Sequence, residues 1–447
     1  MNIEYCRGTG VEGNRDIAET FLQPSGIFVG LSSAGAHRGM RKNSNNSRVL
    51  IYSHDSFGLG HLRRCHAIAQ SLVAHRKGLS VLILTGSPII GSFDFRTRVD
   101  FVRVPGVIKL RNGEYSSLNL HIDISEVLEM RASIIQHTAK VFNPDVFLVD
   151  KEPLGLRGEI LNTLRMLKNA GTLCVLGLRD VMDEPSMLAR EWQRKNALPA
   201  LRDLYDDIWV YGLPQVCKPL EGIHVPPTVE RKMIYTGYLR RKLPESHDVQ
   251  SGNICPFDEP YLLVTTGGGG DGDALIDWVL RAYEADSRLP YPALLVFGPF
   301  MPPKRREKFR RRVNRLPNVE AITFNARVEQ LMAGAAGVVA MGGYNTFCEI
   351  LSFDKPSLIV PRTRPRMEQY IRAGRARELG LVSMLSDAYP RSARRMVEAL
   401  RTLPTQPRPS SVSIPALLDG LDNINQIVDA YLSTDFEGRI GVASQGV

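Results

Sequence analysis

Two glycine-rich stretches in the second half of the chain contain residues that could bind a phosphorylated substrate. They are Thr265-Thr266-Gly267-Gly268-Gly269-Gly270-Asp271-Gly272 and Gly342-Gly343-Tyr344-Asn345-Thr346-Phe347-Cys348-Glu349. Each follows a short apolar run, typical of a buried parallel strand, and precedes a helical pattern. Such turns leave main-chain N–H groups free to bind an anion. We therefore expect a diphosphate to bind at Gly267, Gly268, Gly269, Gly270, Gly342, Gly343, Asn345 and Thr346.

Other polar residues follow the second stretch. Glu349 lies about two turns into the helical pattern, where a carboxylate could hold the vicinal hydroxyls of a ribose. After the strand pattern 357–361 come the arginine-rich run 362–366 and the pair Glu368-Gln369. A phosphate cradle, a sugar-binding carboxylate and a polar clamp, in this order, indicate a nucleotide-sugar site. We expect Asp271 to cap the helix after the first stretch.

Known nucleotide loops do not fit the first stretch. It lacks the GK[ST] ending of a P-loop, which disfavours ATP hydrolysis, and it fails the dinucleotide-binding fingerprint because no acidic residue follows the second strand.

The first half of the chain has one glycine-rich turn of its own. Gly58 and Gly60 precede His61, at the expected N-terminus of a helix that also contains Arg64. The helix dipole lowers the pKa of an imidazole at this end, so a neutral His61 could act as a general base. It could equally be a structural histidine that caps the helix. His54 and Asp55 are weaker candidates.

The elements that must position these residues alternate between strand and helix. Strand patterns lie at 49–52, 79–84, 101–104, 145–150, 173–178 and 207–211, with 232–235 joining them. A break rich in Arg, Pro, Ser and Gly follows at 238–259. Strand patterns then resume at 261–265, 293–297, 319–323, 337–341 and 357–360. Long helical patterns include 61–75, 124–142, 156–169 and 414–432. This alternation predicts two α/β domains, each with a Rossmann-like parallel sheet, facing a central cleft.

Composition narrows the class of protein. The chain has 447 residues, 43% of them hydrophobic and 23% charged, which is typical of a two-domain globular protein. Its six cysteines show no CxxC spacing, so neither a zinc site nor a disulfide framework is expected. The net charge of +9 favours phosphate-bearing substrates or an anionic membrane face. The basic cluster at 304–312 lacks interleaved aromatic residues, so we do not expect a nucleic-acid partner.

The sequence also predicts boundaries. We expect a disordered extension at 1–46, an N-terminal acceptor domain at 47–237, a linker at 238–259, a C-terminal donor domain at 260–432 and a tail at 433–447. Met40 is an alternative start site. Without an apolar run long enough to span a membrane or a secretory signal, we expect a cytoplasmic protein that can contact the inner face of the membrane peripherally.

Taken together, residues 48–432 resemble the family 28 glycosyltransferases of the GT-B fold, which include the bacterial N-acetylglucosaminyltransferase that completes the lipid-linked peptidoglycan precursor. The motif that carries the resemblance is Gly342-Gly343 through Glu349, Pro356, Pro361, Glu368-Gln369-Tyr370 and Arg372-Ala373. The resemblance implies that Gly267 to Gly270 hold the donor diphosphate and that Glu349 binds the ribose. It implies further that Glu368 and Gln369 contact the sugar or diphosphate, that Arg241 binds the diphosphate and that His61 is the base.

The resemblance also implies the reaction. A hexosyl or N-acetylhexosaminyl group would pass from a UDP-sugar to a hydroxyl of a carbohydrate, lipid or small-molecule acceptor, with inversion and without a metal or cofactor. The acceptor side would include Gly58, Gly60, His54, Asp55 and Arg64. The sequence departs from the family pattern at two places. The family's first loop commonly contains GGxxGH, which this sequence does not have in full, and the family's paired Gln-Gln is replaced by Glu368-Gln369.

Other interpretations remain open. The pattern of Gly58, Gly60, His61 and Arg64 is also similar to that of nucleotide-sugar hydrolases of pseudaminic acid synthesis, in which the histidine would activate water. A non-hydrolysing nucleotide-sugar epimerase and a non-enzymatic binding module that kept the donor site are further alternatives.

Overall fold

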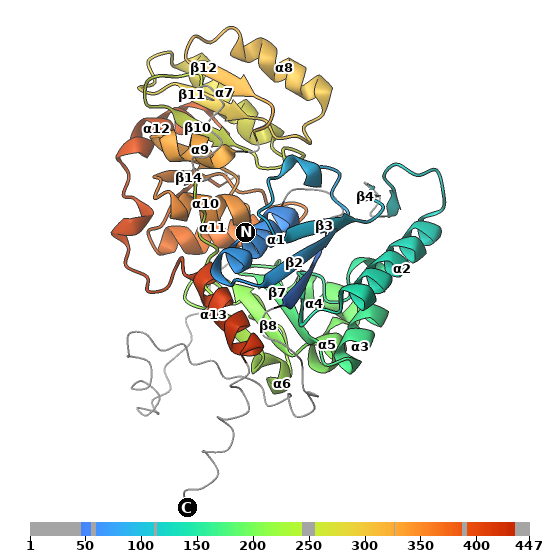
Figure 1. Cartoon of the computed structure of the whole chain (residues 1–447). Helices are drawn as coiled ribbons and strands as arrows, with labels where there is room; N and C mark the ends of the chain where they lie inside the picture. The colour runs from blue at the N-terminus through green and yellow to red at the C-terminus, as the bar shows by residue number, and fades with distance from the viewer. Residues whose placement is uncertain are drawn as a thin grey trace, which may run out of the picture. The chain divides into compact units, whose positions relative to one another are not determined.

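The computed structural model describes residues 46–54, 60–110, 114–243, 255–325, 327–386 and 391–433. In these ranges the strands form two parallel sheets, each with helices packed around it (Figure 1). We call the parts built on these sheets the N-terminal lobe and the C-terminal lobe. The predicted extension 1–46, the tail 433–447 and part of the linker 238–259 lie largely outside the described residues.

The sheet of the N-terminal lobe has seven strands in the described residues, all parallel. In spatial order they are β3 (Val99–Arg103), β2 (Leu79–Thr85), β1 (Ser47–Ser53), β6 (Val146–Asp150), β7 (Leu173–Arg179), β8 (Asp207–Tyr211) and β9 (Met233–Tyr235). Its helices are α1 (Gly60–His75), α2 (Ile124–Phe142), α3 (Leu161–Asn169), α4 (Pro185–Arg194), α5 (Ala197–Asp203) and α6 (Pro227–Glu230). A small antiparallel hairpin joins β4 (Val107–Lys109) to β5 (Tyr115–Ser117).

The sheet of the C-terminal lobe is also parallel, with six strands in the described residues. In spatial order they are β12 (Val319–Ile322), β11 (Ala293–Val296), β10 (Leu262–Thr265), β13 (Gly337–Ala340), β14 (Ser357–Ile359) and β15 (Ser383–Met384). Its helices are α7 (Asp273–Ala285), α8 (Pro303–Val313), α9 (Val328–Gly334), α10 (Tyr344–Ser352), α11 (Glu368–Glu378) and α12 (Ala393–Thr402).

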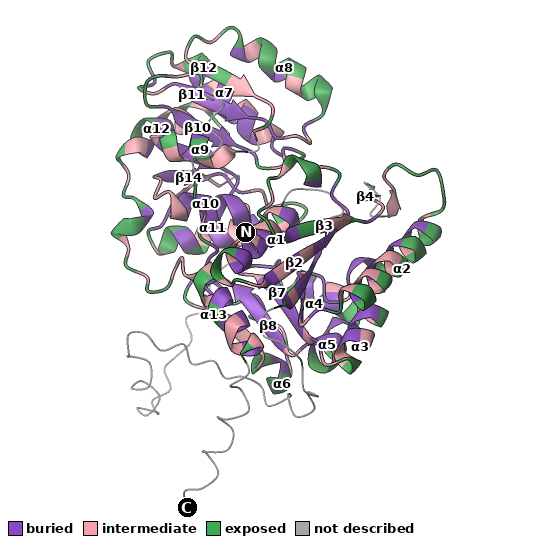
Figure 2. Ribbon diagram, in the orientation of Figure 1, coloured by how far each residue is buried: buried purple, intermediate pink, exposed green. Residues whose placement is uncertain are grey.

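Each lobe has its own apolar core. The strands near the middle of both sheets are almost wholly buried, because helices cover both faces, and exposed residues gather on the outer sides of helices such as α2 and α8 (Figure 2). This explains why the strands are continuous Val-, Ile- and Leu-rich runs instead of alternating patterns. The predicted fold class, with two Rossmann-like parallel-sheet lobes, is confirmed.

In both sheets the direction of winding reverses between two central strands. In the N-terminal lobe the reversal lies between β1 and β6, where Ser53 pairs with Asp150 at the carboxyl ends. In the C-terminal lobe it lies between β10 and β13, where Thr265 pairs with Ala340. Ligands of open parallel sheets bind outside the strand ends at such a reversal. The segments that follow these four strands are therefore the first places to search for a site.

The chain crosses between the lobes twice, at adjacent points. Tyr238 N donates to Leu417 O at 2.8 Å, Gly420 N donates to Tyr238 O at 3.2 Å, and Leu239 forms an antiparallel bridge with Asp419. A Cβ atom on Gly420 would lie 2.4 Å from the carbonyl oxygen of Gly237, so only glycine fits there.

The last helix, α13 (Gly420–Leu432), follows the C-terminal lobe in sequence but packs against α1 of the N-terminal lobe. Ser71 and Asn425 are hydrogen-bonded, and Arg76 pairs with Asp429 at 2.9 Å.

Several details differ from the sequence-based expectations. The predicted helix 156–169 begins only at Leu161, after a short 3-10 turn at 156–158 that follows Gly155 in the left-handed region (φ 67°). The predicted helix 414–432 begins at Gly420. Helices α4, α5 and α6 and the β4–β5 hairpin were not predicted, because short amphipathic segments between long strands carry little periodic signal.

Candidate functional site

The C-terminal lobe places the two glycine-rich stretches side by side at its reversal point. Gly267 comes two residues after the end of β10, and Gly342 two residues after the end of β13. Both have positive φ, 66° for Gly267 and 78° for Gly342, which glycine alone adopts at little cost. A Cβ atom on Gly269 would lie 2.2 Å from the carbonyl oxygen of Phe297. Side chains are thus excluded where a ligand could approach the main chain.

Helix α10 presents free amides beside this turn. Its first main-chain bond runs from Phe347 N to Gly343 O at 2.9 Å, so the amides of Tyr344, Asn345 and Thr346 have no acceptor within the helix. No side chain caps this end. Together with the positive end of the helix dipole, these amides can bind a phosphate group.

A pocket of about 260 Å³ opens onto both stretches. From the C-terminal lobe it is lined by Thr265, Thr266, Gly267, Gly268, Asp271, Val296, Phe324, Asn325, Val328, Met341, Gly343, Tyr344, Asn345, Thr346, Glu349, Arg362, Glu368 and Gln369. From the N-terminal lobe it is lined by Gly60, Arg63, Arg64, Phe93 and Arg179. The pocket therefore combines most of the predicted donor residues with the start of α1, whereas Gly269, Gly270 and Gly342 do not line it.

Glu349 is the most unusual carboxylate in this pocket. It is 1% exposed, and its Oε1 has no hydrogen-bond partner among the described residues. Arg63 Nη2 lies 2.7 Å from Oε1 as an ion pair without hydrogen-bond geometry, and Arg63 also pairs with Glu329. Burial, with a contribution from Glu329 and against the opposing effect of Arg63, raises the pKa of Glu349 to about 7. A buried acceptor of this kind suits a pair of hydroxyl donors.

Glu368 and Gln369 begin α11 at the other end of the pocket. Arg362 connects them, since its Nη2 donates to Glu368 Oε1 at 2.6 Å and its main-chain N donates to Gln369 Oε1 at 3.2 Å. Arg362 Nη1 donates to Asp271 Oδ2 at 2.5 Å. The expectation that Asp271 caps α7 is therefore wrong: Gly272 occupies the cap position without a side-chain bond, and Asp271 binds Arg362 instead.

Arg241 reaches the start of α10 from the crossing between the lobes. Its Nη2 donates to Asn345 Oδ1 at 3.0 Å, while Asn345 Nδ2 donates to Gly60 O at 3.0 Å. Arg241, Asn345 and α1 are thus tied together next to the free amides of α10. Arg241 does not itself line the pocket in the described structure.

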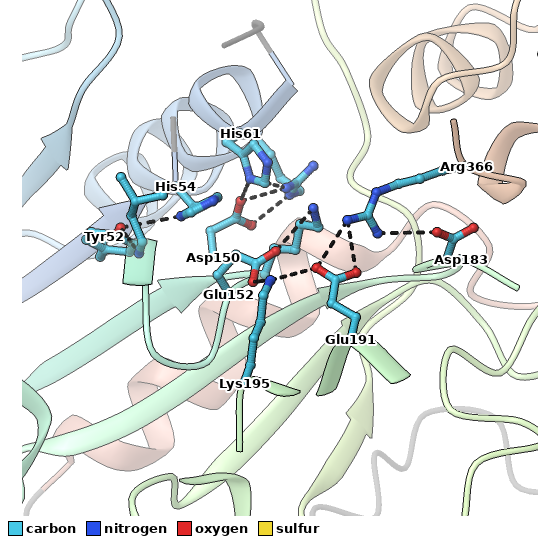
Figure 3. A network of polar contacts seen from close by, with 12 residues as sticks. Tyr52, His54, His61, Asp150, Glu152, Asp183, Glu191, Lys195 and Arg366 are labelled. Atoms are coloured by element: carbon cyan, nitrogen blue, oxygen red, sulfur yellow. Dashed lines mark hydrogen bonds and ion pairs between the residues drawn. The ribbon is translucent and has the colours of Figure 1, made fainter. Parts of the chain in front are cut away.

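In the N-terminal lobe, His61 lies in the first turn of α1 and points toward the carboxyl end of β6 (Figure 3). Its Nδ1 is 2.5 Å from Oδ2 of Asp150, the last residue of β6. Asp150 is 1% exposed and also accepts two hydrogen bonds from Arg64, at 2.8 and 2.6 Å. The short contact orients the ring with Nδ1–H donating to Asp150, which leaves Nε2 as the basic nitrogen.

Burial lowers the pKa of His61 below its usual value, and the nearby cations Arg64 and Lys151 add to this, whereas Asp150 raises it. The pKa of His61 is lowered, as the sequence predicted, but the main cause is burial and not the helix dipole. Because the ring is neutral at neutral pH, His61 can accept a proton. His61 does not line the pocket, although its neighbours Gly60, Arg63 and Arg64 do.

The remaining acceptor-side candidates lie in different environments. His54 is buried beside His61, with ring centroids 5.7 Å apart, and burial lowers its pKa to about 3. Arg64 lines the pocket but is 2% exposed and pairs with Asp150, so it stabilises the contact between His61 and Asp150. Gly58 and Asp55 lie outside the described residues.

Contacts between the lobes surround the pocket. Arg372 on α11 forms a buried bidentate pair with Asp180, at 2.7 and 2.5 Å, and donates to Gly342 O at 3.0 Å. Arg366 pairs with Glu191 and Asp183 of the N-terminal lobe, and Glu191 shares Lys195 with Glu152 (Figure 3). These pairs hold the donor loop 362–368 against the N-terminal lobe.

The sequence did not reveal Asp150, Arg63 or Arg179 as site residues. In the sequence, Asp150 could be recognised only as an acidic residue at the end of a buried strand, and this position was the one signal that it belongs to a site. Arg63 carries no local signal, since its partners Glu329 and Glu349 lie more than two hundred residues away, and nothing in the sequence around Arg179 marks it either. Among the described residues, no cluster of three metal-ligating side chains is present. Nor does any described helix have the length and apolar character needed to cross a membrane.

Two parallel-sheet lobes that face a pocket at their reversal points define the GT-B class of glycosyltransferase folds. The fold is similar to that of LpCGTa, solved in complex with UDP, with a TM-score of 0.56, 13% identity, and coverage of 87% of this chain and 100% of that one. MurG from Acinetobacter baumannii is similar with a TM-score of 0.50, 12% identity, and coverage of 85% and 99%. These likenesses concern the fold alone.

The family follows from sequence. Residues 262–410 match the glycosyltransferase family 28 C-terminal domain. A relative in Methanosarcina mazei, described as an uncharacterized glycosyltransferase, is 25% identical over 357 residues, which are 74% of this chain and 84% of the relative. The chain is therefore a glycosyltransferase of the GT-B fold, and its C-terminal lobe is similar to the C-terminal domain of family 28 over residues 262–410. The predicted resemblance is confirmed.

Proposed function

We propose that this chain is an inverting glycosyltransferase that moves a hexosyl group, such as an N-acetylhexosaminyl group, from a UDP-linked sugar to a hydroxyl of a carbohydrate, lipid or small-molecule acceptor. The observation that carries the proposal is one pocket with free α10 amides, a second glycine turn and the buried Oε1 of Glu349, which accepts no hydrogen bond. Amides suit a diphosphate, and a buried carboxylate suits a ribose. The complex of LpCGTa with UDP supports a uridine nucleotide as the donor.

In this mechanism His61 Nε2 removes the proton of the acceptor hydroxyl, while Asp150 holds the ring and stabilises the imidazolium that forms. The acceptor oxygen attacks the anomeric carbon as the bond to the diphosphate breaks. The leaving diphosphate gains negative charge, which the amides of α10 and the glycine turn after β10 stabilise. Arg241 adds a positive charge near the same helix start. Gly267, Gly268, Gly269, Gly270, Gly342, Gly343, Asn345 and Thr346 form the diphosphate site in this proposal.

We propose further that main-chain amides and arginines do the work that a divalent cation does in other transferases. Activity should then persist in EDTA. If EDTA abolishes turnover and added Mg²⁺ or Mn²⁺ restores it, this part of the proposal is wrong.

The decisive experiment begins with a thermal-shift screen of UDP-, dTDP- and GDP-linked sugars, because a ligand raises the melting temperature with the logarithm of its saturation. The best donor is then incubated with and without acceptor mixtures, and nucleoside diphosphate release is measured. Release that depends on an acceptor, with inverted anomeric configuration in the product, is expected. Rapid release of free sugar without acceptor would assign His61 to water activation, and the chain would be a hydrolase instead.

Membrane contact is a separate proposal that rests on the net charge of +9. Flotation with vesicles containing anionic lipid, at low salt, should carry the protein upward. Vesicles of neutral lipid are the control. If the protein stays at the bottom with both, the acceptor does not have to be sought among lipids.

A further inference from the structure

The arginines that line the pocket differ in whether a carboxylate pairs with them. Arg63 pairs with Glu349 and Glu329, Arg64 with Asp150, and Arg362 with Glu368 and Asp271. Arg179, at the end of β7, is the only pocket-lining arginine without a carboxylate partner among the described residues, and its Nε is buried without a hydrogen bond. A guanidinium in this position costs free energy in the empty pocket, because nothing replaces the water that it lost.

An unpaired acceptor lines the same pocket as this donor. Oε2 of Glu368 is likewise buried without a hydrogen-bond partner among the described residues, while its Oε1 is occupied by Arg362. After burial, Glu368 is the strongest influence on the pKa of Arg179, and Arg179 is the strongest influence on the pKa of Glu368. Both side chains line the same pocket, one from each lobe, and their charges influence each other, although no hydrogen bond joins them.

The chemistry of a group that fits between them is restricted. It must accept a hydrogen bond from Arg179 Nε–H and donate one to Glu368 Oε2, and a hydroxyl does both. A phosphate oxygen accepts from Arg179 but has no proton to give and meets the negative charge of Glu368. An ammonium group donates to Glu368 but cannot accept from Arg179.

We propose that Arg179 and Glu368 together bind one hydroxyl of the transferred sugar, so that the sugar is gripped by both lobes. This inference rests on the proposed function, because it requires a nucleotide sugar in the pocket. It makes Arg179 a specificity-determining residue contributed by the N-terminal lobe. It also gives a reason for Glu368 where related enzymes commonly have glutamine: a carboxylate strengthens the bond to a hydroxyl whose oxygen is held by a cation.

The test compares ligands with and without the sugar. Binding of UDP and of UDP-glucose, UDP-galactose and UDP-N-acetylglucosamine is measured by calorimetry for the wild type, Arg179→Met and Arg179→Lys. Affinity for UDP should stay within about 3-fold, whereas affinity for the best UDP-sugar should fall about 10- to 100-fold in Arg179→Met. Lysine, which keeps the charge but not the position of Nε, should restore only part of this loss.

Monodeoxy analogues of the best sugar identify the hydroxyl. One analogue should bind the wild type about 10- to 100-fold more weakly than the parent compound, and bind Arg179→Met no more weakly than the parent does. Glu368→Ala should show the same loss of dependence on that hydroxyl. If each deoxy analogue loses the same factor in the wild type and in Arg179→Met, no hydroxyl lies between the two side chains.

Thermal unfolding of the free protein separates a ligand contact from a structural one. Arg179→Met should melt at the wild-type temperature or above, because it removes a cation that has no partner. Arg372→Met is the matched control and should melt several degrees lower, since it leaves the buried Asp180 unpaired.

Three outcomes overturn the inference. They are equal losses for UDP and UDP-sugar, which would assign Arg179 to phosphate, no loss for either ligand, and marked destabilisation of free Arg179→Met and Arg179→Lys alike. A wild-type protein that binds neither UDP nor any nucleotide sugar would instead contradict the proposed function itself.

Discussion

The two sides of the cleft differ in how completely their polar groups are paired. On the side of the N-terminal lobe, His61, Asp150 and Arg64 satisfy one another before any substrate is present. On the side of the C-terminal lobe, Glu349 Oε1 and Glu368 Oε2 are buried without hydrogen bonds, and the first amides of α10 are free. Under the proposed function this difference is a division of labour: the proposed base is oriented in advance, whereas the proposed donor-binding groups make these hydrogen bonds only when the donor binds.

The largest effect should come from removing the base. His61→Ala is expected to reduce kcat by about 10²- to 10⁴-fold. Donor affinity should stay within about 3-fold, because His61 does not line the pocket. The measurements are steady-state turnover and calorimetric binding of the donor, with the exposed His75→Ala as the control. Wild-type turnover in His61→Ala would show that another group takes the proton.

The partner of the base gives the next largest effect. Asp150→Asn should reduce kcat by about 10²-fold or more, since the ring loses the acceptor that fixes its tautomer. Because the carboxylate raises the pKa of His61, the acid limb of the pH–kcat/KM profile should move to lower pH. Asp145→Asn, just before the opposite end of the same strand, is the control and should change neither quantity. An acid limb that moves to higher pH would contradict the assigned contact.

On the binding side, Glu349→Ala should weaken donor affinity by about 10- to 100-fold, because a charged acceptor of hydrogen bonds is lost. Turnover at saturating donor should fall less. Glu329→Gln is the matched control, since Glu329 shares Arg63 with Glu349 but does not line the pocket. Equal losses in both variants would mean that the ion-pair cluster matters and that the ribose does not contact Glu349.

The pKa of Glu349, raised to about 7, predicts a pH dependence of donor binding. Only the ionised carboxylate accepts hydrogen bonds from both hydroxyls of a ribose. Affinity should therefore fall by up to about tenfold for each pH unit below about 7. Calorimetry between about pH 6 and pH 8 measures this slope, which should vanish in Glu349→Gln. A slope that survives the substitution belongs to another group.

The smallest effect concerns stability. A carboxyl whose pKa is raised in the folded state holds its proton more tightly there, so the stabilisation is lost as the pH rises through about 7. Glu349→Gln should therefore raise the melting temperature at pH 8 by about 3 °C relative to its effect at pH 5. Glu329, whose pKa is lowered chiefly because Arg63 opposes its burial, should show the opposite sign. Equal shifts in both variants would contradict this pairing.

Local patterns were enough to predict much of the fold. The alternation of apolar runs and helical periods placed α2 at its observed bounds and located the strands of both sheets, except the two-residue β15 (Ser383–Met384), within one or two residues. Turn glycines marked both glycine-rich stretches of the pocket. Strand order was not predictable, because register between segments such as β1 and β6 depends on packing across about a hundred residues. The pairs His61–Asp150 and Arg63–Glu349 in the site could not be predicted for the same reason, since their members lie far apart in the sequence. A helix start such as that after Asp271 was misjudged because a distant arginine competes for the capping carboxylate.

The adjacent crossings at Tyr238 and Gly420 have a mechanical consequence. Two chain segments held together by main-chain hydrogen bonds form one hinge, so any opening of the cleft is a rotation of one lobe about that hinge. Because α13 is fastened to α1, such a rotation carries the C-terminal helix along with His61, and it has to break the pairs that hold Arg366 and Arg372 against the N-terminal lobe.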